Sequence, residues 1–148
     1  MLKITSLAMA MGLALAAPAM AQGVDQNPEA AGVRAALDHY IAGHATGSGA
    51  EHRQAFHDEA KLFWMRDGKF MQRTDDEYIA GSPGKPADDE AQRKRIVQIL
   101  DITGDVAVAK VVLDYPTVTF TDYMSMVKTE EGWKIVNKIF NAKPKAKS

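Results

Sequence analysis

Residues 94–141 read KRIVQILDITGDVAVAKVVLDYPTVTFTDYMSMVKTEEGWKIVNKIFN, and this stretch decides the fold. It reads as β structure almost throughout, and the breaks in it are short. We predict four long strands, at residues 94–102, 105–115, 117–129 and 133–141. The connections between these strands are one to three residues long, and such short connections join antiparallel neighbours, so the second half of the chain predicts an antiparallel sheet. Pro116 cannot donate to a strand ladder, so we expect a bend, a bulge or a sheet edge there.

The residues before this stretch predict helices. Asn27-Pro28-Glu29 is a helix start, because Asn caps well and Pro suits the first turn. The apolar positions that follow place Tyr40 and His44 on one face of a helix that ends between residues 43 and 47. Ser48-Gly49-Ala50-Glu51 matches a capping box, which opens a second, short helix to about residue 57.

A hairpin and a loop connect the helices to the long strands. Residues 61–65 and 69–72 form two strands around Asp67-Gly68, a strong hairpin signal. Thr74-Asp75-Asp76-Glu77 is a second capping box and opens another short helix. Residues 81–90 form a loop, which is our candidate for a mobile flap.

Helices followed by antiparallel strands predict an α+β domain. We expect the N-terminal helices to pack on a strongly curved, mostly antiparallel sheet. A sheet that curls around a long helix forms a cone with an internal pocket at its open end, where such domains bind ligands.

The N-terminus predicts export. Lys3, an apolar run and Ala19-Met20-Ala21 form a signal peptide over residues 1–21, cleaved after Ala21. We therefore expect a periplasmic or secreted protein without a membrane anchor after cleavage. The mature chain would have a flexible lead-in at 22–28, one domain at 29–141 and a basic tail at 142–148.

Composition excludes several classes of function. Without Lys3 the chain carries 17 basic and 19 acidic residues, which argues against nucleic acid as a partner. The absence of cysteine excludes disulfides and thiolate chemistry. Four histidines occur as two pairs spaced five apart, so neither pair shares a helix face. We therefore expect no metal and no cofactor.

Three motifs resemble a known family: Phe56-His57-Asp58-Glu59-Ala60, Thr121-Asp122-Tyr123, and Gly132-Trp133-Lys134-Ile135-Val136-Asn137-Lys138. In this order they resemble the nuclear transport factor 2-like superfamily, and most closely its lumazine-binding-like and SnoaL-like proteins. The resemblance implies a cystatin-like cone with an apolar cavity, often a homodimer through the outer sheet face. Some members are isomerases, cyclases or dehydratases that move protons. Others bind ligands or act as association modules, so the fold does not fix the function.

Asp122 is the candidate acid or base. Ketosteroid-type isomerases of the family use a carboxylate on the first strand after the second helix, and residues 61–65 contain none. Asp122, on the third long strand, lies on the same face as apolar neighbours, and a carboxyl group there could serve in proton transfer. It could equally satisfy the backbone or a nearby Lys or Tyr. Tyr40 and His57 are candidate helpers, with core packing and a turn hydrogen bond as their alternative roles.

Aromatic residues are the candidate ligand contacts, although they could instead fill the cavity. They are Tyr40, Phe56, Phe63, Trp64, Tyr78 and Tyr123. Tyr123 and Asp122 point to opposite sheet faces if the strand is regular. On the last strand, Trp133, Ile135 and Ile139 share a face and predict core, with Lys138 on the other face.

Three functions remain open. The first is an exported small-molecule-binding domain for an apolar or aromatic ligand, and the missing first-strand carboxylate favours it. The second is a SnoaL-like proton-transfer enzyme, an isomerase or cyclase, that uses Asp122. The third is a non-catalytic, dimeric association module.

Overall fold

A computed structural model describes residues 23–146, so the predicted signal peptide lies outside the described residues. The helices are α1 (Ala30–Thr46), α2 (Gly49–Ala55) and α3 (Asp75–Ala80), with short 3-10 helices at Val24–Gln26 and Glu90–Gln92. The strands are β1 (Phe56–Arg66), β2 (Lys69–Thr74), β3 (Lys94–Thr103), β4 (Val106–Asp114), β5 (Val118–Thr129) and β6 (Gly132–Pro144). Within residues 23–146, the helices are all too short or too polar to span a bilayer.

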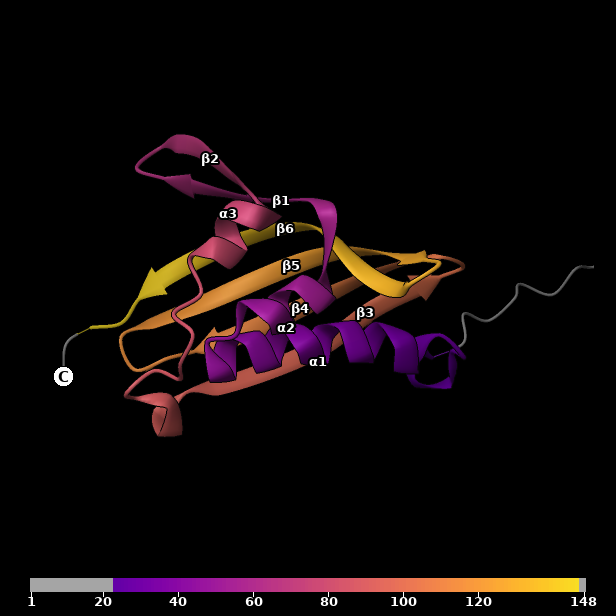
Figure 1. The fold of residues 1–148 in the computed structure, drawn as a ribbon, viewed down its shortest axis with the longest axis horizontal. Coiled ribbons are helices and arrows are strands. Elements are labelled where there is room, and N and C mark those ends of the chain that lie inside the picture. Colours follow the sequence, from indigo (N-terminus) through magenta and orange to yellow (C-terminus); the bar gives the residue numbers. More distant parts are fainter. Residues whose placement is uncertain (1–22, 147–148) are drawn as a thin grey trace, which may run out of the picture.

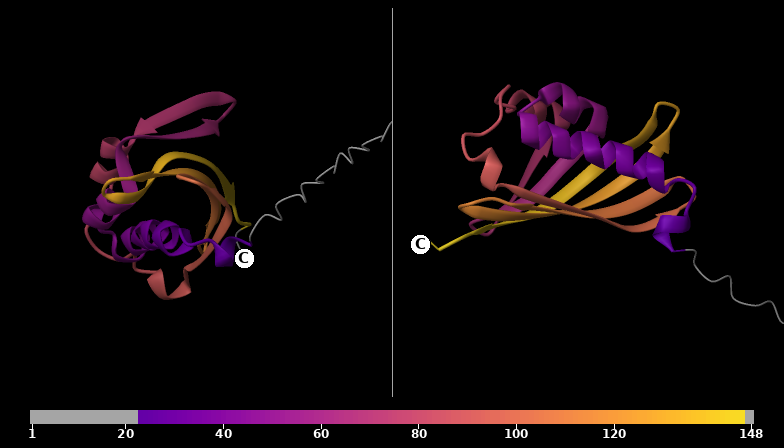
Figure 2. Two further views of the ribbon diagram at one scale, coloured as in Figure 1. Left: turned by 90° about the vertical axis from the view of Figure 1, so that its right-hand side faces the viewer. Right: turned by 90° about the horizontal axis from the view of Figure 1, so that it is seen from below.

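The six strands form one curled sheet in the order β2-β1-β6-β5-β4-β3. Only β1 and β6 pair in parallel, and every other neighbouring pair is antiparallel. Figure 1 shows α1 lying across the strands, and Figure 2 shows the sheet curving around that helix while the β1–β2 hairpin projects as an arm. The chain is thus an α+β protein with a strongly curved, mostly antiparallel sheet, as predicted.

Most local signals act as the sequence indicated, but α1 begins at Ala30 with Glu29 at the N-cap position, so Asn27 does not cap the helix. The Ser48 hydroxyl accepts a hydrogen bond from the Glu51 amide at 3.3 Å, which starts α2. Thr74 and Glu77 form a full capping box at the start of α3. Asp67 and Gly68 have φ of 50° and 74°, the left-handed conformation that a tight hairpin turn requires. Pro116 lies in the short bend between β4 and β5.

Three boundaries differ from the prediction because tertiary partners extend the elements. β1 begins at Phe56, since that residue pairs with Ile135, and α2 accordingly ends before it. β6 runs on to Pro144, which pairs with Val118 of β5, so the start of the predicted tail is strand. The predicted lead-in contains a 3-10 helix whose Val24 packs against the core.

The early start of β1 corrects one inference. The first strand after α2 does contain carboxylates, Asp58 and Glu59, although residues 61–65 do not. Both side chains are exposed, so neither faces the interior of the cone.

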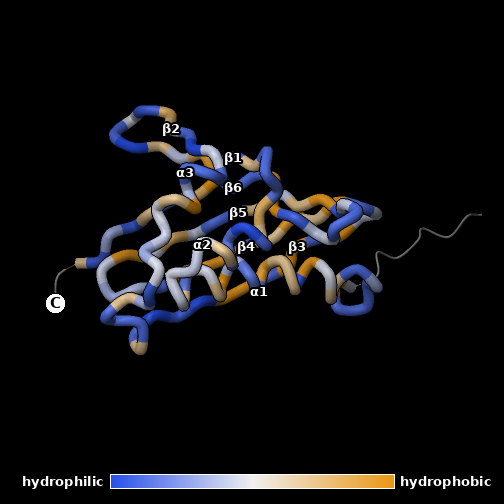
Figure 3. The backbone as a smooth tube through the Cα atoms, in the orientation of Figure 1, coloured by the Kyte–Doolittle hydropathy of each residue, from blue (hydrophilic) through white to orange (hydrophobic). Residues whose placement is uncertain are grey.

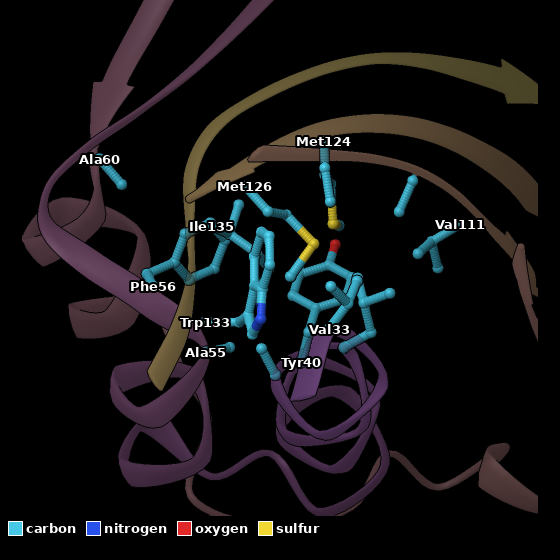
Figure 4. Close-up of a cluster of buried hydrophobic side chains, with 14 of the residues drawn as sticks. Val33, Tyr40, Ala55, Phe56, Ala60, Val111, Met124, Met126, Trp133 and Ile135 are labelled. Carbon is cyan, nitrogen blue, oxygen red and sulfur yellow. The ribbon is translucent and has the colours of Figure 1, made fainter. Parts of the chain in front are cut away.

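The core lies between α1 and the concave face of the sheet. Figure 3 shows hydrophobic segments along α1 and the strands behind it. In Figure 4 Val33 and Tyr40 rise from α1 toward Met124 and Met126 of β5, and all four are at most 1% exposed. Trp133 closes one end of this core and donates from its indole to Glu29 at 3.0 Å.

A β-bulge in β6 changes which side chains point inward. Met126 pairs with Ile135 and Ser125 with Asn137, so Val136 is left as an extra residue. A bulge re-aims the side chains beyond it, because the strict alternation between faces is broken there. Ile139 is consequently 51% exposed on the outer face and not in the core, whereas Lys138 is only 4% exposed and points inward.

Candidate functional site

An interior cavity of about 240 Å³ lies under the curl of the sheet. Its walls are mostly apolar, and α1, α3 and five of the strands contribute to them. The lining residues are His44, Leu62, Trp64, Arg66, Arg73, Tyr78, Leu113, Phe120, Asp122, Lys138 and Phe140. Since Arg66 and Arg73 are solvent-exposed, the cavity reaches the surface between β1 and β2.

Three buried polar side chains meet beside this cavity. The Tyr40 hydroxyl donates to Asp122 Oδ2 at 2.6 Å. Lys138 Nζ donates to the Tyr40 oxygen at 2.9 Å and lies 3.5 Å from Asp122 Oδ2. The group joins α1, β5 and β6, and Asp122 has no exposed surface.

Burial governs the acid–base properties of this group. Removal from water lowers the pKa of Lys138, while the neighbouring Asp122 carboxylate acts in the opposite direction. Burial raises the pKa of Tyr40 and Tyr78, and the negative charge of Asp122 adds to both shifts. Both tyrosines therefore keep their hydroxyl protons at physiological pH. The Lys138 ammonium loses its proton more readily than that of an exposed lysine.

Two polar atoms on cavity-lining residues lack a hydrogen-bond partner within residues 23–146. They are Asp122 Oδ1 and Trp64 Nε1, and both are buried. Buried polar atoms in folded proteins nearly always have a partner, so an unpaired acceptor and an unpaired donor on one cavity indicate a site for a polar ligand or water.

Arginine marks the mouth of the cavity. The guanidinium carbons of Arg66 and Arg73 lie 5.9 and 5.6 Å from the centre of the Trp64 ring, within range of cation–π interactions. On the other side Trp64 stacks on Phe140 at 5.2 Å. The mouth therefore offers flat apolar surface beside two positive charges.

Two buried histidines lie at the cavity: His44 lines it, and the ring of His52 packs against His44. His44 Nε2 and the Tyr78 hydroxyl are 2.9 Å apart, and the His44 and His52 rings are 5.0 Å apart. Burial lowers the pKa of His44 well below its usual value and that of His52 to about 4. Among residues 23–146, there is no group of three His, Asp or Glu side chains arranged to hold a metal ion.

The structure divides the predicted site residues among four places. Asp122, Tyr40, Trp64 and Tyr78 come together at the cavity. Phe56 is buried in the core against the Tyr40 and Tyr78 rings, 5.9 and 5.5 Å away. His57 lies at the start of β1, where its Nδ1 accepts from the Glu59 amide at 3.1 Å, the turn-stabilising role considered for it. Phe63 and Tyr123 lie on the outer face of the sheet.

The outer face carries a second, apolar groove of about 350 Å³. Phe63 of β1 stacks on Phe70 of β2 at 5.5 Å, and Tyr123 and Ile139 of the neighbouring strands face the same groove. Tyr123 is 42% exposed, with the Lys110 ammonium 5.8 Å from its ring centre. Tyr123 and Asp122 thus take opposite faces, as a regular strand requires.

Sequence reasoning missed Lys138. Alternation continued from Trp133 and Ile135 puts residue 138 outside, and only the bulge at Val136 turns it inward. The sequence from Ile135 to Phe140 carries a weak sign of the bulge, because apolar and polar residues do not alternate regularly along it. His44, Arg66 and Arg73 also went unassigned, because they approach the cavity from separate elements.

Comparison with known proteins identifies the family. The model of a family described as "Putative lumazine-binding" matches residues 28–141. Solved structures with the same fold include an NTF2-like protein of unknown function from Shewanella baltica, with TM-score 0.69, 24% identity, and coverage of 78% of this chain and 94% of that one. Another, from Methylobacillus flagellatus, has TM-score 0.59 and 27% identity, and the match covers 76% and 90% of the two chains.

One curated protein is also similar. It is named Aldolase FrzH, from Cladobotryum sp, and is 25% identical over 111 residues, which is 72% of this chain and 85% of the aldolase.

Proposed function

The chain belongs to the "Putative lumazine-binding" family of nuclear transport factor 2-like proteins, and we propose that it is a small-molecule-binding domain whose ligand occupies the interior cavity. The observation that carries the proposal is the unpaired, buried Asp122 Oδ1 beside a cavity with largely apolar walls. Ligand sites of this kind combine hydrophobic lining with a few placed polar groups.

The walls favour a flat molecule. Trp64 and Phe140 are stacked on each other, and Phe120 lies 6.4 Å from Phe140, so aromatic faces dominate one side of the cavity. A planar ring system can pack against such faces with a large gain from burial of apolar surface.

The two ends favour polar groups on that molecule. At the inner end, Lys138 and Tyr40 offer donors and Asp122 offers an acceptor. At the mouth, Arg66 and Arg73 favour a carboxylate, sulfonate or phosphate. We therefore propose a planar ligand with a hydrogen-bonding inner end and an anionic outer end.

Fluorescence titration tests this function. A Trp133→Phe variant leaves Trp64 as the single tryptophan, and lumazine and 1-anilinonaphthalene-8-sulfonate are the probes. Leu113→Phe fills the cavity from β4, while Leu100→Phe adds the same bulk to the outer face of β3, where Leu100 is 40% exposed. We expect binding to be lost in Leu113→Phe and kept in Leu100→Phe. Failure of both probes to bind, or equal binding to both variants, contradicts the proposal.

A second candidate function is acid–base catalysis on a carbonyl compound. The 2.6 Å hydrogen bond between Tyr40 and Asp122 beside the cavity favours it, because the pair can move a proton. The similarity to a protein named as an aldolase supports the same class of chemistry.

Hydrogen exchange tests this second function. In D₂O, NMR follows loss of the α-protons of 2-tetralone, a flat ketone. We expect wild-type protein to accelerate exchange and Asp122→Asn to reduce that acceleration by about 10²–10⁴-fold, the usual contribution of a positioned acid or base. Equal rates with and without wild-type protein would remove this function and leave ligand binding standing.

We also propose that the protein acts outside the cytoplasm, on the strength of residues 1–21. Mass spectrometry of the protein recovered from a bacterial periplasm should give a mature N-terminus at Gln22. Retention of Met1 to Ala21 in a cytoplasmic product would contradict export.

A further inference from the structure

The amine of Lys138 lies between aromatic rings in the wall of the interior cavity. Its Nζ lies 4.9 Å from the centre of the Tyr78 ring and 4.8 Å from that of Phe140. Both rings line the cavity, and so does Lys138 itself. The amine is therefore held beside the space that a ligand would fill.

Lys138 has fewer hydrogen bonds than an ammonium group needs. An ammonium carries three donors. Among the described residues the partners of Nζ are the Tyr40 oxygen at 2.9 Å and Asp122 Oδ2 at 3.5 Å, the second of which is long for a charge-assisted bond. The remaining donor position faces aromatic rings within cation–π range, which replace only part of the hydration that the ammonium loses. Because burial lowers the pKa of Lys138, the neutral amine becomes more accessible than in an exposed lysine.

We propose that Lys138 Nζ is a nucleophile that forms an imine with an aldehyde or ketone bound in the interior cavity. This inference rests on the proposed function, since it requires a ligand in that cavity, and it specifies the ligand as a carbonyl compound. Amines desolvated in hydrophobic pockets are the usual nucleophiles of such chemistry.

The neighbouring groups can carry the protons that the step requires. The Nζ lone pair forms the C–N bond, the carbonyl π electrons move to oxygen, and that oxygen takes a proton from the Tyr40 hydroxyl. Asp122 accepts a proton from Nζ and returns it through Tyr40 to the carbinolamine hydroxyl. Water then leaves as the nitrogen lone pair forms the C=N bond, and the resulting iminium returns its remaining N–H proton to the Tyr40 oxygen. One carbonyl and one amine thus give one imine and one water, and Tyr40 and Asp122 end in their starting protonation states.

The cavity also selects the shape of the carbonyl compound. The reacting carbon must lie at the inner end, against Lys138, while Arg66 and Arg73 line the mouth. A planar aldehyde with an anionic group at its opposite end satisfies both requirements. 4-Carboxybenzaldehyde has this arrangement and is the probe we choose.

Reductive trapping tests the proposal. The full domain is incubated with 4-carboxybenzaldehyde and sodium cyanoborohydride, which reduces an imine to a stable secondary amine, and the modified residue is mapped by peptide mass spectrometry. At neutral pH we expect the adduct at Lys138 to form about tenfold or more faster than any adduct at Lys94, an exposed lysine on β3. The reason is that the lowered pKa of Lys138 leaves more of its amine in the neutral, nucleophilic form. 4-Carboxybenzyl alcohol, which cannot form an imine, should slow the adduct at Lys138 and not at Lys94.

The pH profile gives a second readout. Labelling of Lys138 should level off at a lower pH than labelling of Lys94. The titratable or charged groups around Lys138 are Asp122 on β5, Tyr40 and His44 on α1, His52 on α2, Tyr78 on α3 and Arg73 on β2. Of these, Asp122 alone favours the ammonium, so Asp122→Asn should shift the labelling profile of Lys138 further down in pH.

The outcomes separate this inference from the proposed function. Lys138→Met should abolish the fast adduct, with Lys94→Met as the matched control, and mapping of the wild-type adduct gives the answer even if the Lys138 variant does not fold. If calorimetry shows that the alcohol binds but Lys138 is labelled no faster than Lys94, the amine is only a buried counter-ion and the inference is wrong. If the alcohol does not bind and no Lys138 adduct forms, both the inference and the proposed anionic, planar ligand are wrong.

Discussion

At the residue scale, the interior of the cone holds ionisable side chains out of contact with water. His52 is 5% exposed, and its ring lies beside those of His44, Tyr40 and Tyr78. Such side chains are tolerated in a core only in the protonation state that the surroundings accept. For His44 and His52 this is the neutral form, because burial and the nearby Lys138 charge both oppose protonation.

These histidines predict a loss of stability in mild acid. Burial lowers the pKa of folded His52 to about 4, whereas an unfolded histidine titrates near 6.5. Between those values the unfolded chain binds a proton that the folded chain excludes, so the free energy of unfolding falls as pH drops below 6.5. The slope for each histidine is at most about 1.4 kcal/mol per pH unit. Urea denaturation from pH 7 to pH 5 should show this fall.

A matched pair of variants isolates the cause. His52→Gln should remove the contribution of this histidine and so reduce the dependence of the free energy of unfolding on pH. His57→Gln, on β1 and outside the buried group of rings, is the matched control substitution. An unaltered slope in His52→Gln would show that His52 is protonated in the folded protein.

The same residues show how far the sequence predicts the site. Strand alternation correctly put Asp122 and Tyr123 on opposite faces but left open which of them points inward, and helix periodicity placed Tyr40 on the buried face. The inward direction of Lys138, which contacts both Tyr40 and Asp122, was not predicted, because it depends on how β5 and β6 pair across a bulge. The bulge lies within the β5–β6 hairpin, between the Met126–Ile135 and Ser125–Asn137 pairs, and strict alternation along β6 does not reveal it.

At the element scale, two glycines of α1 allow the helix to pack closely against its neighbours. Gly32 lies against Trp133, whose Cδ1 would be 2.7 Å from an added Cβ, and Gly43 lies against the ring of His52. Glycine weakens an isolated helix, yet here it lets α1 approach both β6 and α2. The two glycines lower the intrinsic stability of the helix, but they allow the close packing of α1 against the core.

Gly43→Ala should therefore destabilise the protein. In an exposed helix this change stabilises by up to about 1 kcal/mol, but here the new methyl group would overlap the His52 ring. We expect a loss of about 1–3 kcal/mol in urea denaturation, the usual cost of overpacking.

The cause can be checked with a double-mutant cycle. In a His52→Ala background the ring is absent, so Gly43→Ala should become neutral or stabilising. Costs that simply add in the cycle would mean that the two residues do not interact.

Most elements follow from local sequence, and the exceptions share a cause. The capping box at Thr74, the Asp-Gly hairpin and the four long strands are set by residues close together in the chain, and the prediction of each is confirmed. Ser48 caps α2 as predicted, but the capping box there is incomplete, because the Glu51 carboxylate bonds to His39 instead. The start of β1 and the end of β6 depend on distant partners, Ile135 and Val118, so local patterns placed them several residues away.

At the scale of the whole molecule, the outer face of the sheet is unusually apolar for a surface. Its exposed side chains include Ile96 on β3, Val106 and Val108 on β4, Tyr123 on β5 and Ile139 on β6, each at least 42% exposed. Contiguous apolar surface of this kind marks interaction sites in soluble proteins.

We predict that the protein is a homodimer that buries this face. A two-fold interface places the same patch on both subunits, so one change on it acts twice. Sedimentation equilibrium should give a dimer at micromolar concentration, and Val108→Glu combined with Ile139→Glu should give a monomer. Ala35→Glu, on the exposed side of α1, is the control. A wild-type monomer at these concentrations would contradict the prediction.

The place of β6 in the sheet has a consequence for how the chain is made. The last strand is not at an edge: it lies between β1 and β5, and its parallel pairing with β1 joins Phe56 to Ile135. Contacts between residues so distant in sequence form late and slowly. A ribosome must therefore release most of the chain before β1 can pair with β6, and until then the sheet of the nascent protein stays open. Delayed closure of this kind is compatible with the proposed export, which requires an unfolded chain to pass through a translocation channel.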